Sequence, residues 1–202
     1  MAEPANAIAR RSALALADAE QASQTARASV VIRLLAPRAR FSLRLDPSLL
    51  PAVKQVAGFT LDMPTNRRVA SGERVAMRPG PDEWLLSGAE GEAARIARDV
   101  GAALGGLHHS LVDISHRHVA LSVAGARAAD VLNSGCPLDL APPAFQVGAA
   151  TRTLLGKAEI ILAKTDDLPT FEVECARSFA AYVHDFLLEA ARAHDTGPIV
   201  HG

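Results

Sequence analysis

The same succession of extended and helical patterns occurs twice along the 202 residues of this chain. Residues 41–45, FSLRL, have an apolar side chain at every second position, which is the period of a half-buried strand. Residues 119–123, VALSV, repeat that pattern in the second half. A chain that repeats its pattern in this way is expected to fold as two related halves.

Each half is expected to contain a strand, a helix, two paired strands and a closing helix. In the first half we expect a helix that begins at Pro47, with Asp46 as its cap, and ends at Gly58, paired strands at 73–77 and 84–86, and a helix at 89–104. In the second half we expect a helix at 126–134, a hairpin of strands 153–164 and 170–175, and a helix at 178–193. These elements predict an α+β fold of two pseudo-symmetric β-α-β-β-α halves.

The expected domain spans residues 30–193, with pseudo-repeats at about 30–106 and 110–193. Residues 1–29 are rich in Ala, Gln, Ser and Thr and are expected to form a flexible arm, and residues 194–202 a tail. The apolar run that follows Arg10 and Arg11 is too short for a signal peptide and is interrupted by Asp18, so a cytoplasmic location is expected. Arg10 and Arg11 are candidate interface residues.

Composition excludes several classes of function. A hydrophobic fraction of 49% and a charged fraction of 21% are typical of a globular protein. The formal net charge of −1 gives no general reason to bind nucleic acid or an anionic membrane, and no segment has the ~18 apolar residues of a membrane-spanning helix. We therefore expect no nucleic-acid or membrane partner.

The histidine-rich stretch is the first place to look for chemistry. It contains His108, His109, His116 and His118 within eleven positions. His116 and His118 would share one face of a strand, but two such histidines without further converging ligands do not define a zinc site. The alternative is that Asp113, Ser115 and His116 form buried hydrogen bonds that fix the turn before the strand. With no GxSxG, GxGxxG or phosphate-loop motif in the chain, we expect no catalytic residue and no metal site.

Other reactive or bulky side chains have structural interpretations. Cys136 and Cys175 are too far apart for a CxxC motif and are expected to be buried free thiols. Three carboxylates alternate with apolar residues on expected strands and are assigned to a solvated sheet face: Glu159, Glu172 and Glu174. Trp84 is expected to anchor the core or to make an intersubunit contact.

Four segments resemble the gamma subunit family of bacterial heterotetrameric sarcosine oxidase. They are GPDEWLL at 80–86, VDISHRHVALSVAG at 112–125, the long stretch from GCPLDL at 135–140 through RTLLGKAEI at 152–160, and VECARSFAAYVHDFLLEAAR at 173–192. GCPLDL and RTLLGKAEI are particular to gamma subunits. DISHR at 113–117 is also similar to the wider aminomethyltransferase superfamily, whose type member is the folate-binding T-protein of the glycine cleavage system.

The resemblance implies an aminomethyltransferase folate-binding-domain-like fold and a non-catalytic assembly subunit. The complex would contain alpha, beta and delta subunits and would demethylate sarcosine oxidatively to glycine, with tetrahydrofolate as co-substrate. FAD, FMN, NAD and zinc would be held by other chains. DISHR lies near the ligand region of the superfamily, which makes His116 and Arg117 the only ligand candidates. The basic N-terminal arm would dock on an acidic region of the alpha or beta subunit.

Two alternatives remain open at this point. The chain could be a stand-alone folate-binding protein of the aminomethyltransferase type, or the gamma subunit of an oxidase that acts on another N-methyl amine. The residues alone do not separate these alternatives, because the amine-oxidising site is expected on a different chain.

Overall fold

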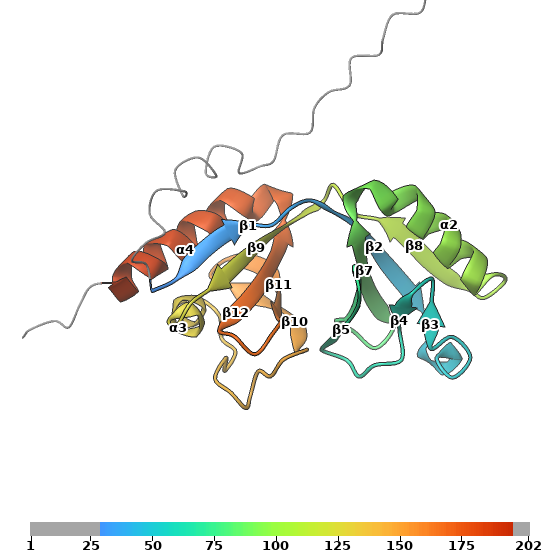
Figure 1. Ribbon diagram of the computed structural model, residues 1–202, viewed down its shortest axis with the longest axis horizontal. Coiled ribbons are helices and arrows are strands. Elements are labelled where there is room, and N and C mark those ends of the chain that lie inside the picture. Colours follow the sequence, from blue (N-terminus) through green and yellow to red (C-terminus); the bar gives the residue numbers. More distant parts are fainter. Residues whose placement is uncertain (1–28, 196–202) are drawn as a thin grey trace, which may run out of the picture.

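Two antiparallel five-stranded sheets dominate the computed structural model, which describes residues 29–195 (Figure 1). The first sheet has the order β5 (Arg67–Ser71), β6 (Arg74–Arg78), β7 (Glu83–Ala89), β2 (Arg38–Leu45), β8 (His109–Asp113). The second has the order β10 (Ala150–Leu155), β11 (Ala158–Lys164), β12 (Thr170–Ala176), β9 (His118–Ala124), β1 (Val31–Leu34). A short hairpin of β3 (Gln55–Val56) and β4 (Phe59–Thr60) lies beside the first sheet. The mixture of antiparallel sheets and separate helices confirms an α+β fold.

The chain crosses between the sheets twice. It begins in the second sheet with β1, which pairs with β9 from Val31 opposite Ala124 to Leu34 opposite Leu121, and then enters the first sheet at β2. It returns through the turn between β8 and β9. The first strand therefore belongs to the second sheet, unlike the expected repeat at 30–106, because its apolar side chain at Ile32 completes the second core.

Each sheet packs its apolar face against its own helices. The first sheet and α2 (Ala93–Leu104) enclose a core around Phe41, Leu43, Trp84 and Ile96. The second sheet is covered by α3 (Ala128–Asn133) and α4 (Ala180–Asp195), around a core that includes Leu121. In Figure 1 α2 and α4 lie on the outer sides of the two sheets, which leaves the opposite sheet faces turned toward each other.

The seam between the two halves has an apolar centre of its own. Its buried members come from both sheets and from the crossover: Val75, Met77, Leu85, Ile114, Ala150, Ile161 and Ala163. Backbone hydrogen bonds continue the contact, from Arg68 N to Gly148 O (2.7 Å) and from Ala150 N to Asn66 O (3.0 Å). The two halves therefore form one body.

The helix expected at 47–57 is wrong. Only a 3-10 turn, η1 (Pro47–Leu49), forms, although Asp46 caps it as predicted by accepting a hydrogen bond from Ser48 N at 2.9 Å. Pro51 ends the helical path because it has no N–H to donate and its ring clashes with the preceding turn. Gly58, expected to end this helix, instead occupies the β3–β4 turn with φ of 81°.

The strand expected at 153–164 is two strands. Gly156, with φ of 58°, turns the chain between β10 and β11, which pair with each other. The hairpin of 73–77 with 84–86 is confirmed by β6 and β7, and the helix at 89–104 by η2 (Glu90–Glu92) and α2. The helix expected at 126–134 is shorter, at Ala128–Asn133.

The closing helix is confirmed and begins with a 3-10 turn, η3 (Arg177–Phe179), before α4. It continues two residues beyond the expected end at 193. The predictions for Arg10 and Arg11 and for most of the arm and tail lie outside the described residues. Among residues 29–195, no helix combines the length and the apolar character needed to cross a membrane.

Candidate functional site

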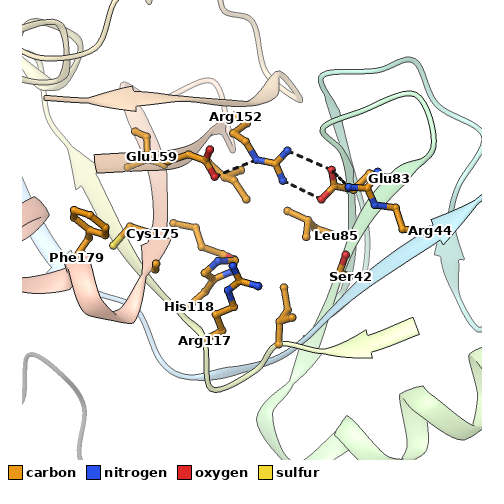
Figure 2. A pocket seen from close by; sticks show the side chains of 15 residues that line it. Ser42, Arg44, Glu83, Leu85, Arg117, His118, Arg152, Glu159, Cys175 and Phe179 are labelled. Atoms are coloured by element: carbon orange, nitrogen blue, oxygen red, sulfur yellow. Dashed lines mark hydrogen bonds and ion pairs between the residues drawn. The ribbon is translucent and has the colours of Figure 1, made fainter. Parts of the chain in front are cut away.

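A cavity of about 530 Å³ lies between the two sheets (Figure 2). Its volume is within the range of small-molecule sites. Apolar side chains form part of its wall: Leu85, Ile114, Ile160, Ile161 and Phe179. The remaining wall is charged, and its cations and carboxylates come from strands of both sheets, which makes this cavity the candidate site.

Arg152 and Glu83 form the clearest contact across the cavity. Arg152 on β10 donates two hydrogen bonds to Glu83 on β7, of 2.9 and 3.2 Å (Figure 2). Arg44 on β2 approaches the same carboxylate at 3.2 Å, and Glu159 lies 3.4 Å from Arg152. The hydrogen bonds with Glu83 raise the pKa of Arg152, against a smaller lowering by burial. This bidentate geometry fixes the positions of β7 and β10 relative to each other.

A second charged cluster is buried deeper in the seam. Arg40 on β2 donates a hydrogen bond of 2.9 Å to Glu174 on β12, and His118 Nδ1 lies 3.1 Å from the other carboxylate oxygen. Burial alone would raise the pKa of Glu174, but the contact with His118 and the charge of Arg40 outweigh burial, so the pKa is below its usual value. The carboxylate is therefore ionised and held by both halves.

Glu172 lies on the same face of β12 as Glu174, but its pKa is shifted in the opposite direction. Burial and the neighbouring charge of Glu174 raise its pKa, while Arg68, Arg38 and Arg40 act in the opposite direction. The solvated sheet face expected for these carboxylates is right for the exposed Glu159 and wrong for Glu174, which is buried. The reason is that this face of the second sheet packs against the first sheet.

The structure places His116 and Arg117 in the turn between β8 and β9, where the chain crosses from one sheet to the other. His116 is exposed and lies in the turn, so it is neither buried as expected nor on a strand with His118. Asp113 and Ser115 fix the turn as expected, with hydrogen bonds that are exposed and not buried: Asp113 Oδ1 accepts from Ser115 N (2.8 Å) and Ser115 Oγ (2.5 Å). Arg117 is also exposed, and it lines the cavity (Figure 2).

The other expected site residues are dispersed or inert. His109 Nδ1 lies 2.8 Å from Leu107 O at the start of β8, and within residues 29–195 no three His, Cys, Asp or Glu side chains are grouped so that they could hold a metal ion. Cys136 and Cys175 are buried free thiols, as predicted. Burial, together with the charge of Glu174, raises the pKa of Cys175 to about 11, so this thiol is protonated and unreactive at neutral pH.

Trp84 is not an interface residue. Its side chain is fully buried within the chain, its Nε1 donates to Leu61 O at 3.0 Å, and the Arg78 guanidinium stacks on its ring at 4.8 Å. The expectation of a core anchor is confirmed, and that of an intersubunit contact is wrong, because Trp84 offers no surface to another protein.

The charged residues that join the halves were missed from sequence: Arg40, Glu83, Arg152 and Glu174. A signal was present in β2, where the side chains opposite the apolar positions include Arg38, Arg40 and Arg44. A strand with arginine at most of its second-face positions indicates that this face meets carboxylates. Among the described residues, neither Ser42 nor Cys175 of the cavity wall makes a side-chain hydrogen bond to His118, and the cations of the wall are largely held by its own carboxylates.

Comparisons with known proteins agree with this architecture. The profile of the "Sarcosine oxidase, gamma subunit family" matches residues 42–193. Sarcosine oxidase subunit gamma of an Arthrobacter species is 32% identical over 155 residues, which are 75% of each chain. The same subunit of Corynebacterium strain P-1 is 32% identical over 120 residues, and this match spans 58% of that relative and 59% of this chain.

Solved structures show the same relationship. A chain of the heterotetrameric sarcosine oxidase from Corynebacterium sp. U-96 superposes with a TM-score of 0.81 at 25% identity, over 95% of this chain and 99% of that one. The glycine cleavage system aminomethyltransferase T from Bartonella henselae has a TM-score of 0.61 at 14% identity, over 82% of this chain and 50% of that one, and shares the fold. The chain belongs to the sarcosine oxidase gamma subunit family.

Proposed function

We propose that the chain is the non-catalytic assembly subunit of a heterotetrameric sarcosine oxidase. Besides family membership, one observation supports a non-catalytic role: most charged groups of the central cavity bind one another and so join the two halves. Arg152 and Arg44 hold Glu83, and Arg40 and His118 hold Glu174. A binding site needs polar groups that are free to meet a ligand, whereas these groups already satisfy one another.

The proposed complex contains alpha, beta and delta subunits besides this chain and is cytoplasmic. It oxidises sarcosine to glycine and transfers the one-carbon unit to tetrahydrofolate, with FAD, FMN, NAD and zinc held by the other subunits. The likeness over 99% of a chain from a heterotetrameric sarcosine oxidase supports this assignment. The neutral Cys175 thiol is consistent with chemistry carried by partners.

The proposal is tested by expressing the chain with and without the other three subunits. Alone, the purified chain should be colourless and inactive toward sarcosine, and omission of this chain should prevent recovery of the intact complex. A stoichiometric flavin spectrum, or sarcosine oxidation by the chain alone, would overturn the proposal. If the recovered heterotetramer oxidised a different N-methyl amine, the assembly role of this chain would stand and only the proposed substrate would be wrong.

A second candidate, a stand-alone folate-binding protein, is favoured by the cavity itself. Its volume is sufficient for a small ligand, and Arg117 is a cation at its wall with no acidic partner within residues 29–195. The remaining cations are held internally, so the wall fits at most one carboxylate of a folate. Calorimetric titration with 5-formyltetrahydrofolate separates the candidates, because saturable one-to-one binding by the isolated chain supports the second and no binding supports the first.

We infer further that the halves are related by a pseudo-twofold axis. In support, the two sheets have equivalent strand orders if β5, β6, β7, β2 and β8 are matched with β10, β11, β12, β9 and β1. The matched strands β8 and β1 occupy corresponding edges although they come from opposite ends of their halves in sequence. We also retain the proposal that the basic arm before residue 30 docks on an acidic region of the alpha or beta subunit.

A further inference from the structure

Two exposed aromatic side chains lie side by side where the closing helix begins. Phe179 is 42% exposed and Tyr182 is 37% exposed, and their rings meet edge to face with centroids 6.5 Å apart. The Tyr182 ring contacts that of the partly buried Phe186 at 6.2 Å. Single exposed apolar residues are common, but aromatic residues are enriched in the buried cores of protein interfaces, and here two of them adjoin. We call Phe179 and Tyr182 the aromatic patch.

Tyr182 of the patch and the neighbouring Phe186 pack on two segments that are distant from them in sequence. Gly156 lies in RTLLGKAEI and Gly135 in GCPLDL, and Gly156 N donates to Gly135 O at 2.9 Å. A Cβ at Gly156 would collide with the Tyr182 hydroxyl, and a Cβ at Gly135 with the Phe186 ring. The Tyr182 hydroxyl also accepts a hydrogen bond from Lys157 N at 3.0 Å.

The two segments that most distinguish the chain's sequence therefore converge beneath the same aromatic side chains. Their glycines leave space for the rings of Tyr182 and Phe186, and their backbone bonds fix the turn on which these rings rest. A surface whose side chains are ordered before binding loses less entropy when it meets a partner.

Two exposed cations in segments that contact the aromatic patch or its neighbours indicate the chemistry of the partner. Arg117 lines the same cavity as Phe179, and Lys157 lies in the turn that contacts Tyr182. Both side chains are exposed, and within the described part of the chain neither has an acidic partner. Glu159, the exposed carboxylate of the same wall, is matched by Arg152 at 3.4 Å. The complementary surface is therefore apolar with carboxylates at its edges.

We propose that the aromatic patch, with Arg117 and Lys157, is the surface by which this chain docks on another subunit of the oxidase. The occupant is a folded partner surface on which apolar side chains meet Phe179 and Tyr182, and carboxylates meet the two cations. This inference rests on the proposed function. The inference adds the location of the contact. It also gives a role to the exposed ring of Phe179 at the cavity wall.

The test uses the full chain and the tagged partner subunits. The double variant Phe179→Ala/Arg117→Glu should weaken binding to the partners about tenfold or more, since aromatic and arginine side chains dominate interface energies. Raising the salt concentration should weaken binding by the unaltered chain more than binding by Arg117→Gln. The Tm of each isolated variant should stay close to that of the unaltered chain, because both substituted side chains are exposed.

Leu168→Ala is the matched control. Leu168 is an exposed apolar residue at the opposite end of β12, roughly 20 Å of strand away from Phe179, and its loss should leave partner binding unchanged. If the double variant bound the partners as tightly as the unaltered chain, the docking proposal would be overturned while the proposed function stood. If the unaltered chain failed to assemble, both would be overturned. If the double variant abolished only self-association of the isolated chain, the occupant would be a second copy, and the docking proposal would again be overturned.

Discussion

The two faces of each sheet differ in chemistry. The faces covered by helices form apolar cores, such as that around Leu121 in the second half and that around Phe41 in the first. The faces that meet in the seam combine a small apolar centre with ion pairs, including Arg40 with Glu174 and Arg152 with Glu83. The comparison indicates that the cores supply most of the stability, whereas the seam determines how the halves are placed and how the fold responds to pH.

The core makes the strongest prediction. Trp84→Ala should lower the free energy of unfolding by about 4 kcal/mol, because it removes a fully buried ring and leaves a cavity in the first half. Urea denaturation followed by circular dichroism measures this change. A cost below about 1 kcal/mol would mean that the first core tolerates a void, and the contrast between core and seam would then be lost.

The buried ion pair makes the next prediction. Arg40→Ala should cost about 3 kcal/mol, since it leaves the buried Glu174 carboxylate with only His118 as its close partner. The control is the double variant Arg40→Met/Glu174→Leu, which removes both charges and should recover most of the loss. A double variant as unstable as Arg40→Ala would show that the apolar replacements do not pack, and would contradict the view that the unpaired charge causes the cost.

Glu172 makes the stability of the seam depend on pH. Its folded-state pKa is raised above the usual 4.5, so its stabilising contribution is complete below pH 4.5 and is lost as pH rises through the folded-state value. Glu172→Gln stays neutral at every pH. The variant should therefore match the unaltered chain near pH 4 and be more stable at pH 7, as measured by urea denaturation at both values.

Glu174 has the opposite sign and serves as the counterpart to Glu172. Its folded-state pKa is lowered, so its contribution is present above the usual value of 4.5 and is lost as pH falls through the folded-state value. Glu174→Gln should cost most at pH 7 and least in acid. Parallel pH profiles for the Glu172 and Glu174 variants would contradict the distinction between these two neighbouring carboxylates.

The smallest effect is expected at the crossover turn. His116→Ala should change the free energy of unfolding by no more than about 0.5 kcal/mol, because the side chain is exposed and the turn is held by Asp113 and Ser115. Thermal unfolding of the isolated chain measures it. A loss of 2 kcal/mol or more would restore a structural role for this histidine and would place part of the seam's stability in the turn.

Local patterns were sufficient to predict the elements with clear periodicity. The strands around Phe41 and Val123, the β6–β7 hairpin and the closing helix are where alternation and helical spacing indicate. The failures have local causes as well. The helix expected after Asp46 meets Pro51, and the single strand expected at 153–164 is divided into β10 and β11 by the turn at Gly156. Both residues stand in the sequence, but the apolar pattern around each of them predicts a longer element than the one that forms.

The candidate site could not be predicted in the same way, because its residues meet only after the chain has crossed between sheets. Arg40 and Glu174 are separated by 134 positions, and no periodicity connects them. The sequence of β1 also does not indicate which sheet the strand joins, and β1 lies in the second sheet. The resemblance to gamma subunits identified the family, but the contact between GCPLDL and RTLLGKAEI beneath Tyr182 required the fold.

Native mass spectrometry of the complex, purified through a tag on another subunit, tests the central claim most directly. The account predicts that this chain is present in one copy in a four-chain assembly, and that chains dissociated from it carry flavin only on the partner subunits. An active oxidase that contains the other subunits and excludes this chain, or flavin that remains with this chain after dissociation, would contradict the account.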